Sequence, residues 1–280
     1  MTSVSERWLR ARNLHAESTG SIHDEQQAQA LGFRHALIGG SYICAFAVRE
    51  LVERFGAAWH ERGFLKQAFI HPLYEPDQFR VLIEPLTPAE HDEQLVSVAL
   101  ETREGTRVTA GYAGLARPGA GVPPWERDDE ASPEAPRGDP LPGVALGTEY
   151  PAYQRTVTIE ESEPWRSMAG DELEWYTARS PWGGPIAPSF KYMLLGGGGE
   201  PEGGLQADPP MRAAMNGTFQ MLQSGPLLIG EPYAVQGRLV EKGFSARSAY
   251  RTNEFTVTDA EGTRVVIARQ KLRWIATRPS

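Results

Sequence analysis

The same pentapeptide, Glu-Gly-Thr-Arg-Val, occurs twice in this chain of 280 residues, at 104–108 and at 261–265. Each copy lies between two strand-like apolar runs, which is the pattern of a hairpin turn. A second repeat precedes them, because residues 38–42 (Ile-Gly-Gly-Ser-Tyr) correspond to residues 186–190 (Ile-Ala-Pro-Ser-Phe). Signals that recur in the same order indicate an internal duplication, in which two similar units share one chain.

A change of composition separates the two copies. Between residues 117 and 143 the sequence contains seven prolines and an acidic run at 128–130, with no apolar periodicity. Such a stretch is typical of a linker. We therefore predict an N-terminal unit over residues 1–116, a Pro-rich linker over 117–149 and a C-terminal unit over 150–280.

Residues 42–55 predict the long helix of the first unit. Apolar side chains fill the first part of this stretch, and apolar and charged residues alternate at helical spacing in the second. The other expected elements are a short helix at 26–31, a turn at 56–63, strands at 64–71, 80–84, 94–100, 106–115 and 153–159, and a second long helix that starts at 189–195.

Gly39, Gly40 and Ser41 lie where the long helix should begin. Small residues there leave space for a bound group, and the first N–H groups of a helix have no partner within the helix. His23 lies upstream, in a loop, and a histidine near such a helix start can bind and polarise a carbonyl group. The structural alternative stays open, because a lone histidine and a Gly-Gly pair more often serve the fold alone.

This order of features resembles the MaoC-like, or hydratase 2, branch of the hot-dog superfamily. Residues 22–25 (Ile-His-Asp-Glu) match the histidine end of the family's D-x(4)-H motif, residues 32–40 match the start of its central helix, and residues 69–77 match the start of the next strand. The resemblance covers most of the chain. It implies an α+β double hot-dog fold with two antiparallel sheets, each wrapped around a long central helix.

The resemblance also implies catalytic residues, because similar hydratases use Asp and His to activate a water or to move a proton beside a thioester. The first unit keeps His23 but has Ser18 where the family has Asp, whereas the second keeps Asp171 but has Tyr176 in place of the histidine. The expected catalytic residues are therefore His23, Asp171 and Tyr176. Two structural alternatives remain open, in which Asp171 caps a turn and Tyr176 fills a tunnel.

Three residues are expected to bind the substrate: Gly40, Ser41 and Trp182. Gly40 and Ser41 would offer main-chain N–H groups to a developing enolate oxygen. Trp182 belongs to the stretch 180–190, which parallels the helix start of the first unit. No cofactor is expected, and no metal, because the six histidines do not have the spacing of zinc ligands.

These residues imply an enoyl-thioester hydratase or a 3-hydroxyacyl dehydratase-like lyase. Its substrate would be an acyl thioester, of coenzyme A or acyl carrier protein, or a related small carbonyl compound. Neither unit has the complete Asp/His pair, so two alternatives are kept. One is a non-catalytic hot-dog protein that binds an acyl chain or partners an active homologue. The other is an isomerase or cyclase of natural-product biosynthesis that uses the same tunnel.

Composition excludes several other classes of protein. The formal net charge of -8 argues against a nucleic-acid partner, and no apolar run is long enough to span a bilayer. The N-terminus lacks the apolar segment of a signal peptide, and a single cysteine, Cys44, excludes an intrachain disulfide. We therefore expect a cytoplasmic protein without a membrane partner. One assembly that we consider is a homodimer.

The linker should tolerate change. Its prolines and acidic residues are expected to bury little surface, so shortening residues 117–143 by a few residues should cost little stability. Thermal unfolding checks this, and a fall in melting temperature of more than about 10 °C would show that the deleted part packs in the core.

Overall fold

Eleven strands carry the fold of the described residues, which are 3–4, 7–86, 95–117, 138–191, 207–208, 213–245 and 248–275 of this computed structural model. The first half contains β1 (Ser3–Val4), β2 (Leu9–Arg10), β3 (Gly63–Phe69), β4 (Gln78–Pro85), β5 (Val96–Thr102) and β6 (Arg107–Leu115). The second half contains β7 (Tyr153–Thr156), β8 (Ala214–Gln223), β9 (Pro232–Phe244), β10 (Ser248–Thr258) and β11 (Arg264–Ile275). The four longer strands of the first half lie within two residues of their expected bounds.

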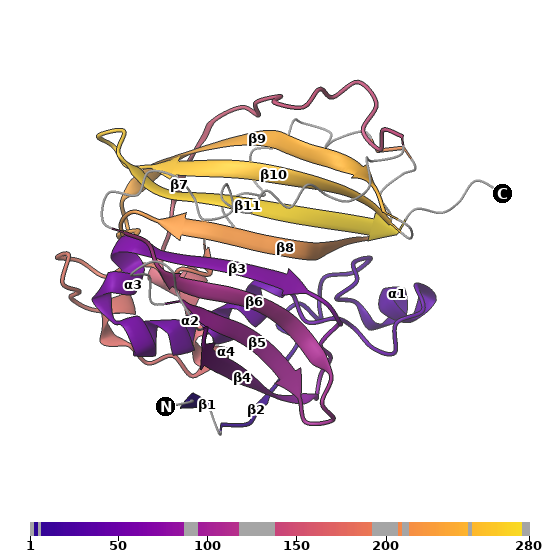
Figure 1. Ribbon diagram of the computed structural model, residues 1–280, viewed down its shortest axis with the longest axis horizontal. Coiled ribbons are helices and arrows are strands. Elements are labelled where there is room, and N and C mark those ends of the chain that lie inside the picture. The colour runs from indigo at the N-terminus through magenta and orange to yellow at the C-terminus, as the bar shows by residue number, and fades with distance from the viewer. Residues whose placement is uncertain are drawn as a thin grey trace.

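The strands of both halves form one antiparallel sheet (Figure 1). Ten strands follow the order β1-β4-β5-β6-β3-β8-β11-β10-β9-β7, and β2 pairs with β4. The expectation of two separate sheets is therefore wrong. The two halves merge because β3 and β8 pair in antiparallel fashion, from Phe64 opposite Leu222 to Ala68 opposite Thr218.

Each half has the same strand order outward from this junction. The first half places β6, β5 and β4 beside β3, and the second places β11, β10 and β9 beside β8. The two Glu-Gly-Thr-Arg-Val segments form equivalent hairpins, in which Gly105 and Gly262 have φ angles of 83° and 79°. Glycine adopts such positive φ values without strain. This agreement supports the internal duplication, while the unit boundaries near residues 116 and 150 stay a prediction.

The helices of the described chain are α1 (Glu25–Ala30), α2 (Gly40–Phe55), α3 (Ala57–Arg62) and α4 (Ile159–Ala169), with a short 3-10 turn at Glu174–Tyr176. Only α2 and α4 reach seven residues in this part of the chain. The first expected central helix is α2, whereas most of the second, expected at 189–195, lies outside the described residues. Helix α3 forms where only a turn was expected. The expected strand at 153–159 ends early, because Thr158 and Glu161 form a capping box that starts α4.

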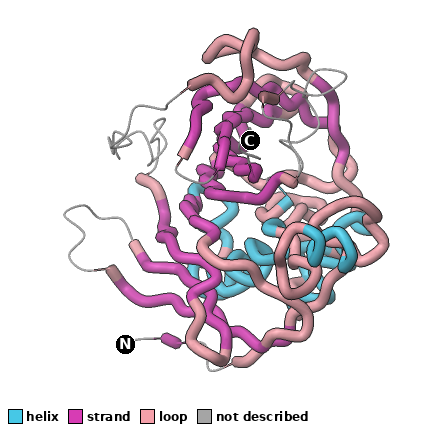
Figure 2. Tube along the Cα trace, turned by 90° about the vertical axis from the view of Figure 1, so that its right-hand side faces the viewer, coloured by secondary structure: helices cyan, strands magenta, loops and turns pink. Residues whose placement is uncertain are grey.

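Helix α2 is the centre of the hydrophobic core. Every residue from Ser41 to Val48 is buried, and so are Leu51, Val52 and Phe55. Such a helix has apolar neighbours on several sides, and α2 contacts β4, β5, α3 and α4. Figure 2 shows the helices gathered on one side of the sheet. The loop before Gly40 is therefore attached to a rigid element.

A closed polar triangle joins the halves beside the β3–β8 junction. The Trp59 indole Nε1 donates to Ser189 Oγ at 3.1 Å, and this hydroxyl donates to Gln223 Oε1 at 2.8 Å. Gln223 Nε2 then donates to the Trp59 carbonyl at 2.8 Å. All three residues are buried. Each group therefore satisfies another, as buried polar groups require.

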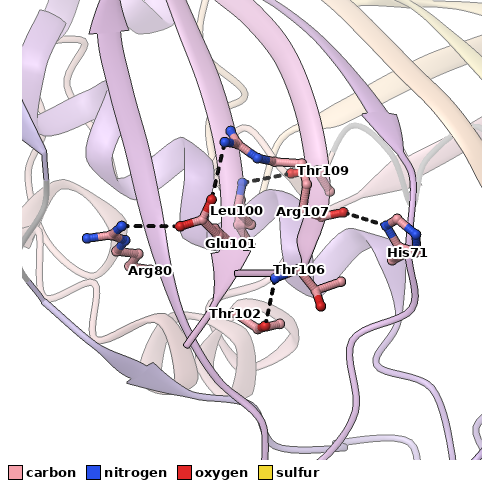
Figure 3. A network of polar contacts seen from close by, with 8 residues as sticks. All are labelled: His71, Arg80, Leu100, Glu101, Thr102, Thr106, Arg107 and Thr109. Atoms are coloured by element: carbon pink, nitrogen blue, oxygen red, sulfur yellow. Dashed lines mark hydrogen bonds and ion pairs between the residues drawn. The ribbon is translucent and has the colours of Figure 1, made fainter. Parts of the chain in front are cut away.

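A second network fixes the β5–β6 hairpin and the loop that follows β3 (Figure 3). Glu101 accepts from Arg80 at 3.1 Å and from Arg107 at 3.2 Å, which ties β4, β5 and β6 together. The His71 ring Nδ1 contacts the Arg107 carbonyl oxygen at 2.9 Å. The network therefore anchors the first part of the loop in which Glu75 lies.

Two residues near the end of the expected linker, Pro140 and Leu141, are buried. Leu141 has no exposed surface, and Lys242 Nζ donates to Asp139 Oδ2 and to the carbonyls of Leu141 and Val144. The expectation that the linker buries little is therefore wrong for Pro140 and Leu141, whereas residues 138, 139, 142 and 143 are exposed. Residues 118–137 lie outside the described part, and the predicted tolerance remains a prediction.

The polar triangle generates a stability prediction. In a Gln223→Leu variant the Ser189 hydroxyl loses its acceptor, and the Trp59 carbonyl keeps only the Gly63 N–H as a donor. Unfolding in urea should show a loss of about 1 to 3 kcal/mol, the cost of leaving one buried polar group unsatisfied. Gln154→Leu is the control, because Gln154 is exposed on β7. Equal losses in the two variants would contradict this account.

Candidate active site

Both the ring and the main chain of His23 are held by hydrogen bonds. Its ring Nδ1 contacts the Leu37 carbonyl oxygen at 2.7 Å, and its own carbonyl accepts from Asn13 Nδ2 at 2.9 Å. The Leu37 N–H donates to the Ile22 carbonyl, so residues 22 and 37 are joined. A carbonyl oxygen only accepts, so Nδ1 carries the proton. In the neutral ring, Nε2 is then the basic nitrogen.

Aromatic rings surround the inner side of this loop. The His15 ring centroid lies 5.4 Å from that of His23 and 5.1 Å from that of Tyr42, the third residue of α2. Trp165 of α4 stacks on Tyr42 at 3.5 Å. Burial lowers the pKa of His15, and so does the nearby His23, while burial raises the pKa of Tyr42 to about 12. At neutral pH this side of the site is uncharged.

Helix α2 begins beside these rings without a side-chain cap. Gly39 is its N-cap residue, and among the described residues no side-chain cap bonds to this helix start. The N–H groups of Gly40 and Ser41 have no acceptor within the helix, as at any helix start. Gly40 keeps part of its surface exposed, whereas Ser41 is buried. The expected substrate-binding pair therefore lies on the same element as Tyr42.

A cavity of about 170 Å³ lies beside His23. Two carboxylates that sequence reasoning did not select, Glu25 and Glu75, line it, together with Asn13, Ala16, His35 and Ala36. Glu25 accepts from the Ala36 N–H at 2.7 Å and contacts the His35 ring at 2.9 Å, and these contacts lower its pKa. Glu75 accepts from the Asn13 N–H at 2.9 Å. The structure thus places carboxylates near His23 although Ser18 stands in the family's Asp position.

Asp171 lies farther along α2, away from its start. It is buried, and burial raises its pKa, while the Leu173 N–H and the charges of Arg49 and Arg166 act in the opposite direction. Arg49 comes seven residues after Tyr42 in α2, roughly 10 Å along the helix axis. Asp171 Oδ1 accepts from the Leu173 N–H at 3.4 Å, as expected if it caps a turn. His23 and Asp171 are therefore not brought together as one pair.

Tyr176 lies in an aromatic cluster around His60 of α3. The His60 ring centroid is 6.2 Å from that of Tyr176, 6.3 Å from that of Trp175 and 5.7 Å from that of Trp182. His60 is fully buried, neither ring nitrogen has a hydrogen-bond partner among the described residues, and burial lowers its pKa to about 4. Tyr176 is 1% exposed, so side chains fill its surroundings. Sequence reasoning gave no signal for His60.

Main-chain bonds show that Tyr176 occupies the place of His23 in the second half. The Ile186 N–H donates to the Trp175 carbonyl, just as the Leu37 N–H donates to the Ile22 carbonyl. Isolated bridges join Leu37 to Tyr74 and Ile186 to Leu228. Ile186 therefore corresponds to Leu37, one residue from the sequence-based match with Ile38.

Trp182 borders a second cavity, of about 400 Å³. The loop after β8, the start of β9 and the β10–β11 hairpin form the rest of its lining, which includes Tyr233, Glu231, Asp259 and Arg264. The expected substrate-binding residues are therefore divided between two places: Gly40 and Ser41 lie at the start of α2, and Trp182 lies beside the His60 cluster.

The described residues contain no group of three His, Cys, Asp or Glu side chains arranged to hold a metal ion. No helix among them is long and apolar enough to cross a membrane.

Solved structures resemble this chain over nearly its full length. A MaoC domain protein of Chloroflexus aurantiacus, assigned as a dehydratase, is 10% identical, with a TM-score of 0.62 and coverage of 97% of this chain and 95% of that chain. A MaoC-like dehydratase is 14% identical, with a TM-score of 0.58 and coverage of 97% and 99%. A conserved Mycobacterium tuberculosis protein with a double hot-dog fold is 10% identical, with a TM-score of 0.66 and coverage of 98% and 96%.

No protein-family model matches the chain, and no curated protein matches it. The structural matches at such low identity establish the fold. The chain has an α+β double hot-dog fold of the kind found in MaoC-like dehydratases, and the expected resemblance is confirmed at this level.

The buried His60 generates a prediction of pH dependence. Its folded pKa, about 4, lies below its ordinary value of 6.5, so the unfolded chain binds the extra proton between these values. The free energy of unfolding should be highest above pH 6.5 and should fall by up to about 3 kcal/mol as the pH drops to 4. A His60→Phe variant should lose this part of the slope, whereas His71→Phe, at an exposed position, should keep it. An unchanged slope in His60→Phe would contradict the assignment.

Proposed function

We propose that the protein is an enoyl-thioester hydratase or 3-hydroxyacyl dehydratase-like lyase, with His23 as the proton shuttle. The observation that carries this proposal is the bond from His23 Nδ1 to the Leu37 carbonyl, because it leaves Nε2 as a base. The uncapped start of α2 supports it, since main-chain N–H groups there can stabilise an enolate oxygen. The fold that the chain shares with MaoC-like dehydratases is consistent with this chemistry.

In the hydration direction, His23 Nε2 takes a proton from water while the water oxygen bonds to carbon 3 of the enoyl thioester. The electron pair of the C2=C3 double bond moves toward the thioester carbonyl, whose oxygen becomes an enolate held by the N–H groups of Gly40 and Ser41. His23 then returns its proton to carbon 2, and the product is a 3-hydroxyacyl thioester. Dehydration follows the same steps in reverse.

Glu75 is our candidate for the carboxylate that the family places five residues before the histidine. It lines the same cavity as His23 and accepts one N–H, that of Asn13. Glu25 is the weaker candidate, because the Ala36 N–H and the His35 ring occupy it. In this proposal Glu75 holds the reacting water, and Ser18 has no catalytic part.

The second half carries no separate active site in this proposal. Tyr176 stands in the position of His23, but it is 1% exposed and its ring lies against that of His60, which Trp175 and Trp182 also contact. A thioester therefore has no access to its phenol. Asp171 then serves the packing of α4 against α2.

The test is turnover of crotonyl-coenzyme A, a short enoyl thioester. His23→Ala should lower kcat/KM by about two to four powers of ten, the usual value of a positioned proton shuttle. The control is Gln154→Ala, because Gln154 is exposed on β7, in the second half of the chain. It should leave turnover unchanged.

Two further variants separate the alternatives. Loss of turnover in Asp171→Asn or Tyr176→Phe, with His23→Ala active, would move the site to the second half. Tight binding of acyl thioesters by a wild-type protein that turns none of them over would favour the non-catalytic alternative. Turnover of a carbonyl compound that is not a thioester would favour the isomerase or cyclase.

A further inference from the structure

The side chain of Asn216, on strand β8 of the second half, packs against the first residue of α2. A Cβ placed on Gly40 would lie 3.0 Å from Asn216 Cγ and closer still to Nδ2, so the amide group lies against the Gly40 backbone. Asn216 is two residues from Thr218, where the β3–β8 pairing ends. The junction of the two halves therefore brings a second-half side chain to the helix start that lies near His15 and Tyr42.

A hydrogen bond sets the orientation of this amide. Gln270 Nε2, on the neighbouring strand β11, donates to Asn216 Oδ1 at 2.7 Å. The amide oxygen is thus turned toward Gln270, and the NH₂ group is turned toward Gly40. Within the described residues no acceptor bonds to Nδ2, and Nδ2 is not among their buried, unsatisfied atoms. It therefore remains accessible to solvent or to a ligand.

The position of Nδ2 has a chemical consequence. The N–H groups at the start of α2 and the Asn216 NH₂ group are all donors, and they lie around the partly exposed Gly40. Several donors beside one another suit one acceptor oxygen, and they suit it best when it is negatively charged.

We propose that Asn216 donates a hydrogen bond to the carbonyl oxygen of the thioester bound at the start of α2. The proton shuttle then comes from the first half, and one donor to the developing enolate comes from the second. The proposal rests on the proposed function, and it assigns to β8 a catalytic role that the sequence motifs do not indicate. Gln270 is a positioning residue, because it acts by orienting Asn216.

Two variants of Asn216 test this role. Asn216→Leu removes the donor at similar size, and Asn216→Asp keeps the shape but replaces the donor with an acceptor. Hydration of crotonyl-coenzyme A should fall in kcat by about 10²-fold in Asn216→Leu, and at least as far in Asn216→Asp, because one donor to an enolate is lost. The control is Gln220→Leu, at a partly exposed site on the same strand, which should stay within about threefold of wild type.

A binding measurement keeps the test independent of turnover. The saturated butyryl-coenzyme A cannot be hydrated, and calorimetry should show weaker binding to Asn216→Leu than to Gln220→Leu. Thermal unfolding of both variants checks that they fold, and Asn216→Asp serves as the second probe if the leucine variant does not. Unchanged kcat and unchanged butyryl-coenzyme A affinity in a folded Asn216 variant would overturn the proposal.

The outcomes distinguish this inference from the proposed function. If His23→Ala abolishes turnover while both Asn216 variants remain active, the proposed function stands and the role of Asn216 is refuted. If His23→Ala leaves turnover unchanged, the proposed function fails, and unchanged butyryl-coenzyme A binding in Asn216→Leu would refute this inference as well. Loss of kcat in both His23→Ala and Asn216→Leu supports the two together.

Discussion

The pairing of β3 with β8 is the constraint on which the rest of the structure depends. It turns the strands of two halves into one sheet, and the Trp59–Ser189–Gln223 triangle closes beside it. Antiparallel strands pair in a fixed register, so this junction also determines which residues of the first half lie opposite which residues of the second. The same junction brings Asn216 to Gly40, and the packing of α4 on α2 brings Trp165 to Tyr42.

The burial of α2 determines where the groups at its N-terminus lie. A helix enclosed for most of its length cannot shift to accommodate a ligand, so the loop before Gly40 is held in place by the core. His23 gains its orientation from the Leu37 carbonyl, which belongs to that loop. In the second half the equivalent place holds the buried Tyr176, in the aromatic cluster around His60. The two halves thus share a strand order, and in the first half a cavity lies beside the residue at this position.

Local patterns in the sequence predicted much of the first half. The repeated Glu-Gly-Thr-Arg-Val turns form equivalent hairpins, and the apolar run at 42–55 forms α2. The single sheet could not be predicted in this way. Apolar periodicity shows that β3 and β8 are strands, but it does not show that the edges of these two strands pair with each other. The start of α4 had a signal in Thr158 and Glu161, but Pro164 inside the helix obscured it.

Only those residues of the candidate site that belong to a local sequence motif could be predicted. His23, Gly40 and Ser41 lie around the start of α2, and their assignment remains a proposal. Glu75 and Asn216 come from segments far from His23 in the sequence, and no local pattern brings them to it. His60 is buried by rings more than one hundred residues later in the chain, so its burial depends on tertiary packing alone.

The central claim is that a thioester carbonyl binds at the start of α2, between His23 and Asn216. A crystal structure with a 2-oxoalkyl-coenzyme A would test it most directly, because this analogue keeps the carbonyl but cannot react as an enoyl thioester. The account predicts the carbonyl oxygen within about 3 Å of the N–H of Gly40 or Ser41 and of Asn216 Nδ2. It also predicts His23 Nε2 on the side of carbon 3. An analogue bound instead in the cavity beside Trp182, with the start of α2 empty, would contradict it.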